Sequence, residues 1–196
     1  METISEQIAY FGRMMFERNL TDIAGGNLSV RVDDMIYCSP RYAGHKWHWN
    51  FPAEMVVSGS LQTDDLLSNP SFSREGVSHL AVYRALPQVK AIVHAHSPHI
   101  LVFCAAMRPI EPVLESTTKY GVIEMIDPAP PYSQQQADGI IAELRGKEAL
   151  IMSAAAAVLI PKHGIFVASQ NLWAAMDALE RINTNAYCIL AQKLLP

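Results

Sequence analysis

The sequence predicts one α/β domain that spans residues 1–196. Segments with apolar residues at helical spacing alternate along the chain with short apolar segments typical of strands. No repeat, low-complexity tract or long Gly/Ser linker divides the chain, and its 196 residues match the usual domain length of about 100–200 residues. The composition is 50% hydrophobic and 17% charged, so a disordered chain is excluded and burial of surface between subunits is expected.

The N-terminal third is expected to form a helix followed by a β-hairpin. Residues 3–18 carry apolar side chains at helical spacing, with polar side chains on the opposite face. Gly25-Gly26-Asn27 signals a turn, and residues 27–32 and 35–39 flank Asp33-Asp34 as the two strands of a hairpin. The glycines allow the backbone to approach another group closely.

Residues 40–70 are rich in turn residues and are expected to form a loop with one short strand at 55–58. Aromatic and basic side chains cluster at the start of this loop: Arg41, Tyr42, His45, Lys46, Trp47, His48 and Trp49. Such side chains line a ligand pocket or pack at a subunit interface, and the sequence leaves both roles open. A helix is then expected over residues 74–86, with Glu75 in its first turn.

The second half of the sequence is expected to continue the alternation of strands and helices. Helices are expected from Pro98 to about residue 106, from Ser133 to about 145 and from Asn171 to about 194, because Pro, Ser and Asn are favoured at helix starts. Short apolar segments predict strands over residues 91–93, 122–126, 157–161 and 165–168. The whole chain is therefore expected to hold five helices and at least six short strands.

The charge pattern excludes several classes of partner. The net charge is −4 at pH 7 and the basic residues form no long run, so neither a nucleic acid nor an anionic membrane is indicated as a partner. The longest apolar segments, such as residues 154–160, are far shorter than the ~20 residues of a membrane span, and the acidic N-terminus does not resemble a secretory signal. We therefore expect a soluble, cytoplasmic protein.

The cysteines give no sign of a disulfide framework. Cys38, Cys104 and Cys188 are odd in number, widely spaced and without a CxxC motif. A thiolate zinc site is likewise not indicated, and the three residues are expected to act as small apolar side chains in a reducing compartment.

Histidines carry the strongest chemical signal. His94 and His96 stand two residues apart at the end of an apolar strand, so their imidazoles project from one face, although an isolated pair of this kind is more often structural. His163 precedes Gly164 at a second strand–turn junction and offers a third imidazole. Three histidines with one open position are the pattern of a catalytic zinc site. Glu75 is the carboxylate expected beside it, and a charge that complements the helix dipole is the alternative role.

Four motifs in order resemble the class II aldolase/adducin family, from about residue 5 to residue 192. They are Gly26-Asn27-Leu28-Ser29-Val30-Arg31, Ser73-Arg74-Glu75 with His79 and Tyr83, Ala91-Ile92-Val93-His94-Ala95-His96-Ser97, and His163-Gly164, before a terminal helix with Ala175, Leu179 and Glu180. The resemblance implies a three-layer α/β/α fold with a mainly antiparallel central sheet flanked by helices. It also implies a homotetramer with active sites at the subunit interfaces.

The resemblance further implies a metal-dependent lyase. In the sugar-phosphate aldolases of the family, the positions that hold a divalent metal correspond to His94, His96 and His163, and the catalytic glutamate corresponds to Glu75. Each subunit is expected to bind one divalent ion, zinc by default, although three imidazoles also accept Mn²⁺, Co²⁺ or Fe²⁺. The implied reaction is retro-aldol cleavage of a small sugar phosphate or related hydroxy-carbonyl anion through a metal-stabilised enediolate.

The chain departs from the family pattern at its substrate-binding residues. Gly26-Asn27 is intact, but Arg41 and Arg74 stand where the family has small hydrogen-bond donors. Arg74 directly follows Ser73, which is itself a small donor of the expected kind. The planar guanidinium binds carboxylate as well as phosphate, so these five residues are expected to bind a small anionic substrate. Exposure to solvent, or ion pairs across a subunit boundary, are the alternatives for the two arginines.

A second departure follows Pro112, where the family aldolases place a tyrosine that protonates the product. Glu115 occupies that place and is a candidate second acid/base, with Tyr120 five residues further on. An exposed carboxylate at a strand end is the alternative role for Glu115.

These departures leave two alternatives to the aldolase. A metal-dependent decarboxylase or dehydratase of a carboxylated substrate is favoured by Arg41, Arg74 and the aromatic cluster. A non-catalytic, adducin-like interaction module would have lost ligating histidines, whereas this chain retains all three histidines and Glu75.

Overall fold

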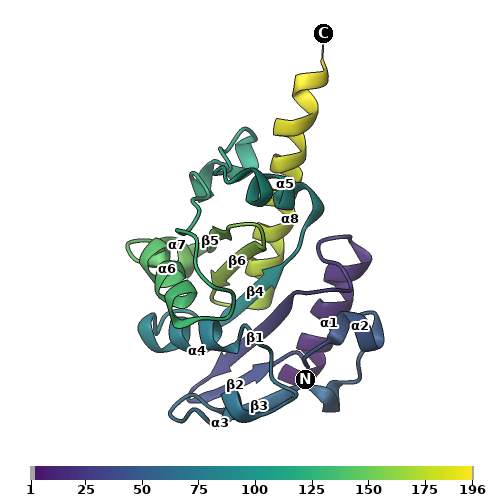
Figure 1. Cartoon of the computed structure of the whole chain (residues 1–196), viewed down its shortest axis with the longest axis vertical. Coiled ribbons are helices and arrows are strands. Elements are labelled where there is room, and N and C mark those ends of the chain that lie inside the picture. The colour runs from purple at the N-terminus through teal and green to yellow at the C-terminus, as the bar shows by residue number, and fades with distance from the viewer. Residues whose placement is uncertain (1–2, 196) are drawn as a thin grey trace.

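The computed structural model describes residues 3–195, which build one six-stranded sheet with helices on both faces (Figure 1). The strand order is β3-β2-β1-β4-β6-β5, and every neighbouring pair is antiparallel. The strands are β1 (Asn27–Val32), β2 (Met35–Cys38), β3 (Val57–Ser60), β4 (Ala91–Ala95), β5 (Ala155–Ile160) and β6 (Gly164–Ser169). β4 lies inside the sheet between β1 and β6, so both of its neighbours fix its position.

Helices fill the connections between the strands. They are α1 (Ile4–Glu17), α2 (Ala43–Trp47), α3 (Asp65–Ser68), α4 (Gly76–Ala85), α5 (Pro98–Ala106), α6 (Gln134–Leu144), α7 (Glu148–Ser153) and α8 (Leu172–Ala191). Three short 3-10 helices, η1 (Ala53–Met55), η2 (Glu115–Tyr120) and η3 (Gln192–Leu194), complete the described part of the chain.

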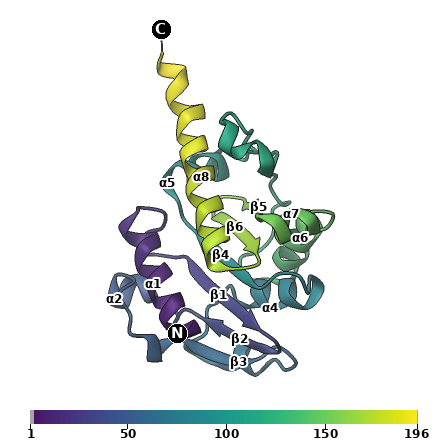
Figure 2. The same ribbon diagram turned by 180° about the vertical axis from the view of Figure 1, so that it is seen from behind.

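The sheet separates two hydrophobic cores. Leu28 and Val93 on the sheet pack with Leu179 of α8 in a core that also includes α1 and α5. Ile92 points to the other face, because side chains alternate along a strand, and packs with Leu80 of α4 in the second core. Figure 2 shows α1 and α8 in front of the sheet, with α4 and α6 on the other side. The three-layer α/β/α arrangement with an antiparallel central sheet is therefore confirmed.

Side chains at the predicted helix starts act as caps. The hydroxyl oxygen of Thr3 accepts the backbone N–H of Glu6 in a capping box at α1. Ser133 accepts the N–H of Gln136 at α6, Asn171 accepts the N–H of Ala174 at α8, and Pro98 is the first residue of α5. These contacts explain why four of the five long helices begin where the sequence predicts.

Other expectations were wrong in detail. The segment 122–126 forms only isolated bridges, from Ile123 to Ile110 and from Met125 to Leu159 of β5. A proline-rich segment follows at 128–131, and prolines lack the N–H that a longer ladder needs. The strand expected at 55–58 lies at Val57–Ser60, and α4 begins one residue after Glu75.

The short helices α2, α3 and α7 were not predicted. They contain 5, 4 and 6 residues, which is too short for a hydrophobic period to appear in the sequence. All three cysteines are free, as predicted. Within residues 3–195, no helix is both long enough and apolar enough to cross a membrane.

Candidate metal centre and active site

Three histidines from two distant parts of the chain meet at one end of the sheet. His94 is in β4 and His96 follows it directly, whereas His163 lies in the turn between β5 and β6. Because β4 pairs with β6, with Ala95 opposite Ile165, the end of β4 lies beside this turn. The ring centroids are 5.1, 4.8 and 5.2 Å apart, and potential ligand atoms of the three residues lie within 4.8 Å of one another.

Glycines make this close approach possible. A Cβ atom at Gly164 would lie 2.4 Å from the carbonyl oxygen of Ala95, so only glycine allows the start of β6 to pass this close to β4. A Cβ atom at Gly25 would lie 2.0 Å from Cε1 of His96. The imidazole of His96 therefore rests directly against the backbone of the 25–26 turn.

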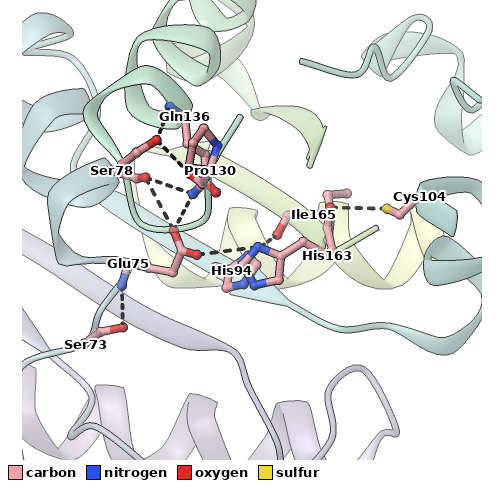
Figure 3. Close-up of polar contacts among 11 residues, drawn as sticks. Ser73, Glu75, Ser78, His94, Cys104, Pro130, Gln136, His163 and Ile165 are labelled. Atoms are coloured by element: carbon pink, nitrogen blue, oxygen red, sulfur yellow. Dashed lines mark hydrogen bonds and ion pairs between the residues drawn. The ribbon is translucent and has the colours of Figure 1, made fainter. Parts of the chain in front are cut away.

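The histidines are held in the neutral form that a metal ligand requires. Nδ1 of His94 lies 3.0 Å from the carbonyl oxygen of Ile165 and donates its proton to it, which leaves Nε2 free (Figure 3). Burial lowers the pKa of His94 well below its ordinary value, and the neighbouring imidazoles His163 and His96 lower it further. Burial likewise lowers the pKa of His163 to about 4 and lowers that of His96.

Glu75 reaches the same cluster from the N-terminus of α4. It is the N-cap residue of α4, and only 2% of it is exposed. Its Oε2 accepts a hydrogen bond of 2.7 Å from Nε2 of Gln136 on α6, and a longer one of 3.4 Å from Ser78 (Figure 3). Its Oε1 lies 3.5 Å from Nδ1 of His163. Burial raises the pKa of Glu75 to about 7, although Gln136, Ser78 and Arg74 oppose the shift.

The unpaired atoms of the cluster fit a divalent metal ion. Within residues 3–195, Nε2 of His94, Nε2 of His96, Nδ1 of His163 and Oε1 of Glu75 are buried without a hydrogen-bond partner. Native proteins rarely leave buried polar atoms unsatisfied, and four in one place indicate a missing partner. Three imidazoles beside a carboxylate are a donor set suited to zinc and its first-row neighbours.

A pocket opens from the histidines toward the 40–44 segment. Arg41 and Arg74 stand in its wall, and neither forms an ion pair with a carboxylate in the described part of the chain. Their guanidinium groups lie over aromatic rings, that of Arg41 4.8 Å from Tyr42 and that of Arg74 4.5 Å from Tyr132. Nε of Arg41 is buried without a partner, as is Oδ1 of Asn27. The pocket thus offers unneutralised positive charge next to the three histidines.

Nine of the ten residues predicted to bind metal or substrate or to act in catalysis line this pocket. They are Gly26, Asn27, Arg41, Ser73, Arg74, Glu75, His94, His96 and His163. Glu115 does not line it and is exposed on η2, and the hydroxyl of Tyr120 binds Asp177 instead. A role for Glu115 at this site would therefore require a neighbouring chain.

The aromatic cluster does not act as one unit. Only Arg41 and Tyr42 line the pocket, whereas His45 in α2 and His48 directly after it are exposed. Trp49 is completely buried in the core of the α1 face. Only part of the cluster therefore lines the pocket, and packing at a subunit interface, the other role that the sequence leaves open, stays a prediction for its exposed members.

Three further residues contact the site and were not identified from the sequence. Tyr132 lines the pocket and has a left-handed backbone, with φ of 63°. Gln136 binds Glu75, and Asp22 lies beside His96. Each contact depends on how separate segments pack, so no local pattern could have indicated it.

Comparison with known proteins agrees with this geometry. The sequence profile of the Class II Aldolase and Adducin N-terminal domain matches residues 6–190. A 3-oxo-tetronate 4-phosphate decarboxylase of Haemophilus influenzae is 29% identical over 189 residues, covering 92% of this chain and 84% of that protein. An L-fuculose phosphate aldolase of the same organism is 26% identical over 168 residues, covering 83% and 73%. The L-fuculose-1-phosphate aldolase of Thermus thermophilus has a TM-score of 0.77 at 20% identity, covering 95% and 92%.

Proposed function

The chain belongs to the class II aldolase and adducin family, and on this premise we propose that it is a metal-dependent lyase. It breaks a carbon–carbon bond beside the carbonyl group of a small phosphorylated substrate. The observation that carries the proposal is the arrangement of one pocket, in which the buried Glu75 and three neutral histidines face two arginines without ion pairs. An adducin-like interaction module has no need of such a cluster.

His94, His96 and His163 would hold one divalent ion per subunit, zinc by default, with Mn²⁺, Co²⁺ and Fe²⁺ as the other candidates. When bound, such an ion stabilises negative charge that develops on a carbonyl oxygen. The protein contributes the fixed positions of the imidazoles and the shape of the pocket.

Arg41 and Arg74 would bind the phosphate group of the substrate. A guanidinium that is stacked on an aromatic ring keeps its N–H edge free for paired hydrogen bonds to phosphate oxygens. Gly26, Asn27 and Ser73 line the same wall and would add further hydrogen bonds. If an arginine instead bound a carboxylate that leaves as carbon dioxide, the salt bridge would stabilise the substrate and slow the reaction. The two arginines are therefore better suited to the phosphate group, which stays on the product.

Decarboxylation of a 3-oxo acid is the first candidate reaction. The bond between the 2-carbon and the carboxylate breaks, its electron pair enters an enolate, and carbon dioxide leaves. Glu75, whose pKa near 7 leaves it partly protonated at neutral pH, then delivers its proton to the 2-carbon and is reprotonated from water. The relative named as a 3-oxo-tetronate 4-phosphate decarboxylase, which aligns with 92% of this chain, supports this candidate.

Retro-aldol cleavage is the second candidate, favoured by the likeness to L-fuculose phosphate aldolases. Glu75 in its ionised form would then take the proton of the hydroxyl next to the breaking bond, and an aldehyde would leave. This reaction needs a proton donor for the product, and Glu115 of a neighbouring chain is the proposed group. Dehydration of a related substrate would use the same pocket and the same carboxylate.

We also propose a homotetramer with active sites at its interfaces. The end of α8 projects beyond the rest of the molecule (Figures 1 and 2). Tyr187 near this end of the helix is 52% exposed, and Leu194 and Leu195 beyond it are 86% and 73% exposed. Large apolar side chains exposed in one region favour contact with another chain. Light scattering coupled to size exclusion measures the number of chains.

The experiment that tests the function is a substrate panel assayed with the metal-loaded enzyme. Phosphorylated 3-oxo acids should release carbon dioxide, and phosphorylated ketoses should release dihydroxyacetone phosphate or an analogue if the second candidate is correct. Each substrate is compared with its unphosphorylated form, which should react far less well. No turnover of any member by protein that binds metal would contradict the lyase.

A further inference from the structure

A carboxylate stands beside one of the three histidines. Asp22 lies in the segment that joins α1 to β1, and its Oδ1 is 3.5 Å from Nδ1 of His96. Nε2 of His96 is the atom left buried and without a partner. The two nitrogens of this ring therefore have distinct surroundings, one beside a carboxylate and the other buried without a hydrogen-bond partner among the described residues.

Asp22 is fixed in place although nearly half of its side chain is exposed. Its Oδ1 accepts hydrogen bonds of 2.9 Å from the backbone N–H groups of both Ala24 and Gly25. Gly25 is also the residue against which the ring of His96 packs. One oxygen atom thus holds the turn under the imidazole and faces the Nδ1 of the same imidazole.

Trp49 holds the backbone of Asp22 from the protein interior. Its indole N–H donates a hydrogen bond of 2.9 Å to the carbonyl oxygen of Asp22, and the side chain is fully buried. Trp49 and the preceding His48 both have left-handed backbones, with φ of 63° and 48°. Such conformations cost free energy in residues other than glycine and persist only where the surroundings impose them. Here they carry the indole into the core, where it reaches Asp22.

His94 has a comparable oxygen partner. Its Nδ1 donates a hydrogen bond of 3.0 Å to the carbonyl oxygen of Ile165. An oxygen at Nδ1 keeps the proton on that nitrogen, so that the lone pair of Nε2 is available as a ligand. A carboxylate does so more strongly than a carbonyl, because its charge also raises the basicity of the ligating nitrogen.

We infer that Asp22 is a positioning residue for His96, and that Trp49 anchors Asp22 in this role. Asp22 keeps the proton of His96 on Nδ1 and directs Nε2 toward the other two imidazoles. The inference rests on the proposed metal site. It also gives Trp49 a function, the support of a metal ligand, that does not require contact with substrate.

The test is the affinity of the purified protein for Zn²⁺, measured by competition with a chromogenic chelator. Asp22→Asn keeps an amide oxygen for the N–H groups of Ala24 and Gly25 but removes the charge. It should weaken Zn²⁺ binding about 10-fold, and Asp22→Ala about 100-fold. Asp33→Asn, at an exposed position in the β1–β2 turn, is the matched control and should bind Zn²⁺ as the wild type does.

The role of Trp49 is tested in the same way. Trp49→Phe retains an aromatic ring but loses the indole N–H, and it should weaken Zn²⁺ binding, whereas Trp47→Phe should not. The visible absorption of Co²⁺-loaded protein gives a second readout, because it reports the ligand field of the metal. Its bands should shift in Asp22→Asn and remain unchanged in Asp33→Asn, which a general loss of stability would not produce.

The outcomes separate this inference from the metal site itself. Wild-type affinity and an unchanged Co²⁺ spectrum in both Asp22 variants would overturn the positioning role while the three-histidine site stands. A wild-type protein that binds neither Zn²⁺ nor Co²⁺ would overturn both. Weaker binding in the Asp22 variants with a normal control would support the inference.

Discussion

Oε1 of Glu75 lies 3.5 Å from Nδ1 of His163, while Oε2 of the same carboxylate is bound to Gln136. The two oxygens therefore have separate tasks. Oε2 fixes the side chain between α4 and α6, and Oε1 remains without a hydrogen bond at the edge of the cluster. A carboxylate held in this way can exchange a proton with a substrate without moving.

Replacing Glu75 with Gln should leave the protein folded, since the amide has nearly the same shape, but remove the proton carrier. We expect turnover to fall about 10²–10⁴-fold, the usual contribution of a positioned acid or base, with the metal retained. Steady-state kinetics and metal analysis of the same sample check both parts. Glu124→Gln, at an exposed site, is the control. An unchanged rate in Glu75→Gln would assign the proton transfer to another group.

Replacing His96 or His163 with Ala should abolish metal binding, because two imidazoles do not hold a first-row ion tightly enough to survive purification. Plasma mass spectrometry should find about one divalent ion per wild-type chain and almost none in either variant. His45→Ala, at an exposed position of α2, should retain the wild-type content. Full metal content in either ligand variant would exclude that residue from the site.

Replacing Arg74 or Arg41 with Ser should raise the KM for a phosphorylated substrate. The loss of a charge-assisted hydrogen bond corresponds to about 10–100-fold in binding. The kcat should change less, because neither guanidinium touches the carbon that reacts. Arg145→Ser, at an exposed helix end, serves as the comparison. If Arg74→Ser instead increased activity toward phosphorylated substrates, the arginine would be selecting against phosphate.

Replacing Gly25 with Ala should displace His96, because the new Cβ would lie 2.0 Å from Cε1 of the ring. We expect metal affinity to fall strongly while the circular dichroism spectrum stays close to that of the wild type. Gly139→Ala, within α6, places its Cβ 3.3 Å from Ile126 and should bind metal normally. Undiminished affinity in Gly25→Ala would mean that the ring can find another position.

The fully buried His79 should make stability depend on pH. Burial lowers its pKa to about 3 from the ordinary 6.5, and its Nδ1 lies 2.7 Å from the hydroxyl of Ser29. Between these two values the unfolded chain binds a proton that the folded chain excludes, so stability is complete above pH 6.5 and falls as the pH is lowered toward 3.

The measurement is urea unfolding of metal-free protein at several pH values, compared with His79→Gln. Between pH 7 and pH 4.5 the wild type should lose roughly 2–3 kcal/mol more than the variant, since each pH unit below 6.5 contributes about 1.4 kcal/mol. Other buried histidines titrate in both proteins and cancel in the difference. Parallel curves for the two proteins would show that His79 is not the group responsible.

The sequence predicts the features that depend on local chemistry. Ser133 and Asn171 cap the helices that they were expected to open, and His94 and His96 have the spacing that places both rings on one side of a strand. The close approach of His163 was also expected, since Gly164 marks a tight strand–turn junction. In each case a few adjacent residues determine the outcome.

The features that were missed depend on contacts between distant segments. Gln136 meets Glu75 because α6 packs on α4, and Asp22 meets His96 because the 22–26 turn lies against the end of β4. Trp49 stands among other aromatic residues in the sequence, and it is completely buried in the core through a left-handed backbone that no propensity predicts. The segment 122–126 has the apolar residues of a strand but lacks a continuous partner.

The sheet order also bears on how the chain reaches its final state. His94 is bonded to Ile165, which follows 71 residues later, although β4 pairs on its other side with β1. During synthesis, the N-terminal strands emerge with β4 as an apolar edge that has no neighbour until β6 has left the ribosome. Such an edge can pair with other chains, and contacts between remote segments form slowly. The interval between the two strands is therefore the stage at which nascent chains are most prone to aggregate, and the histidine cluster is among the last parts to be completed.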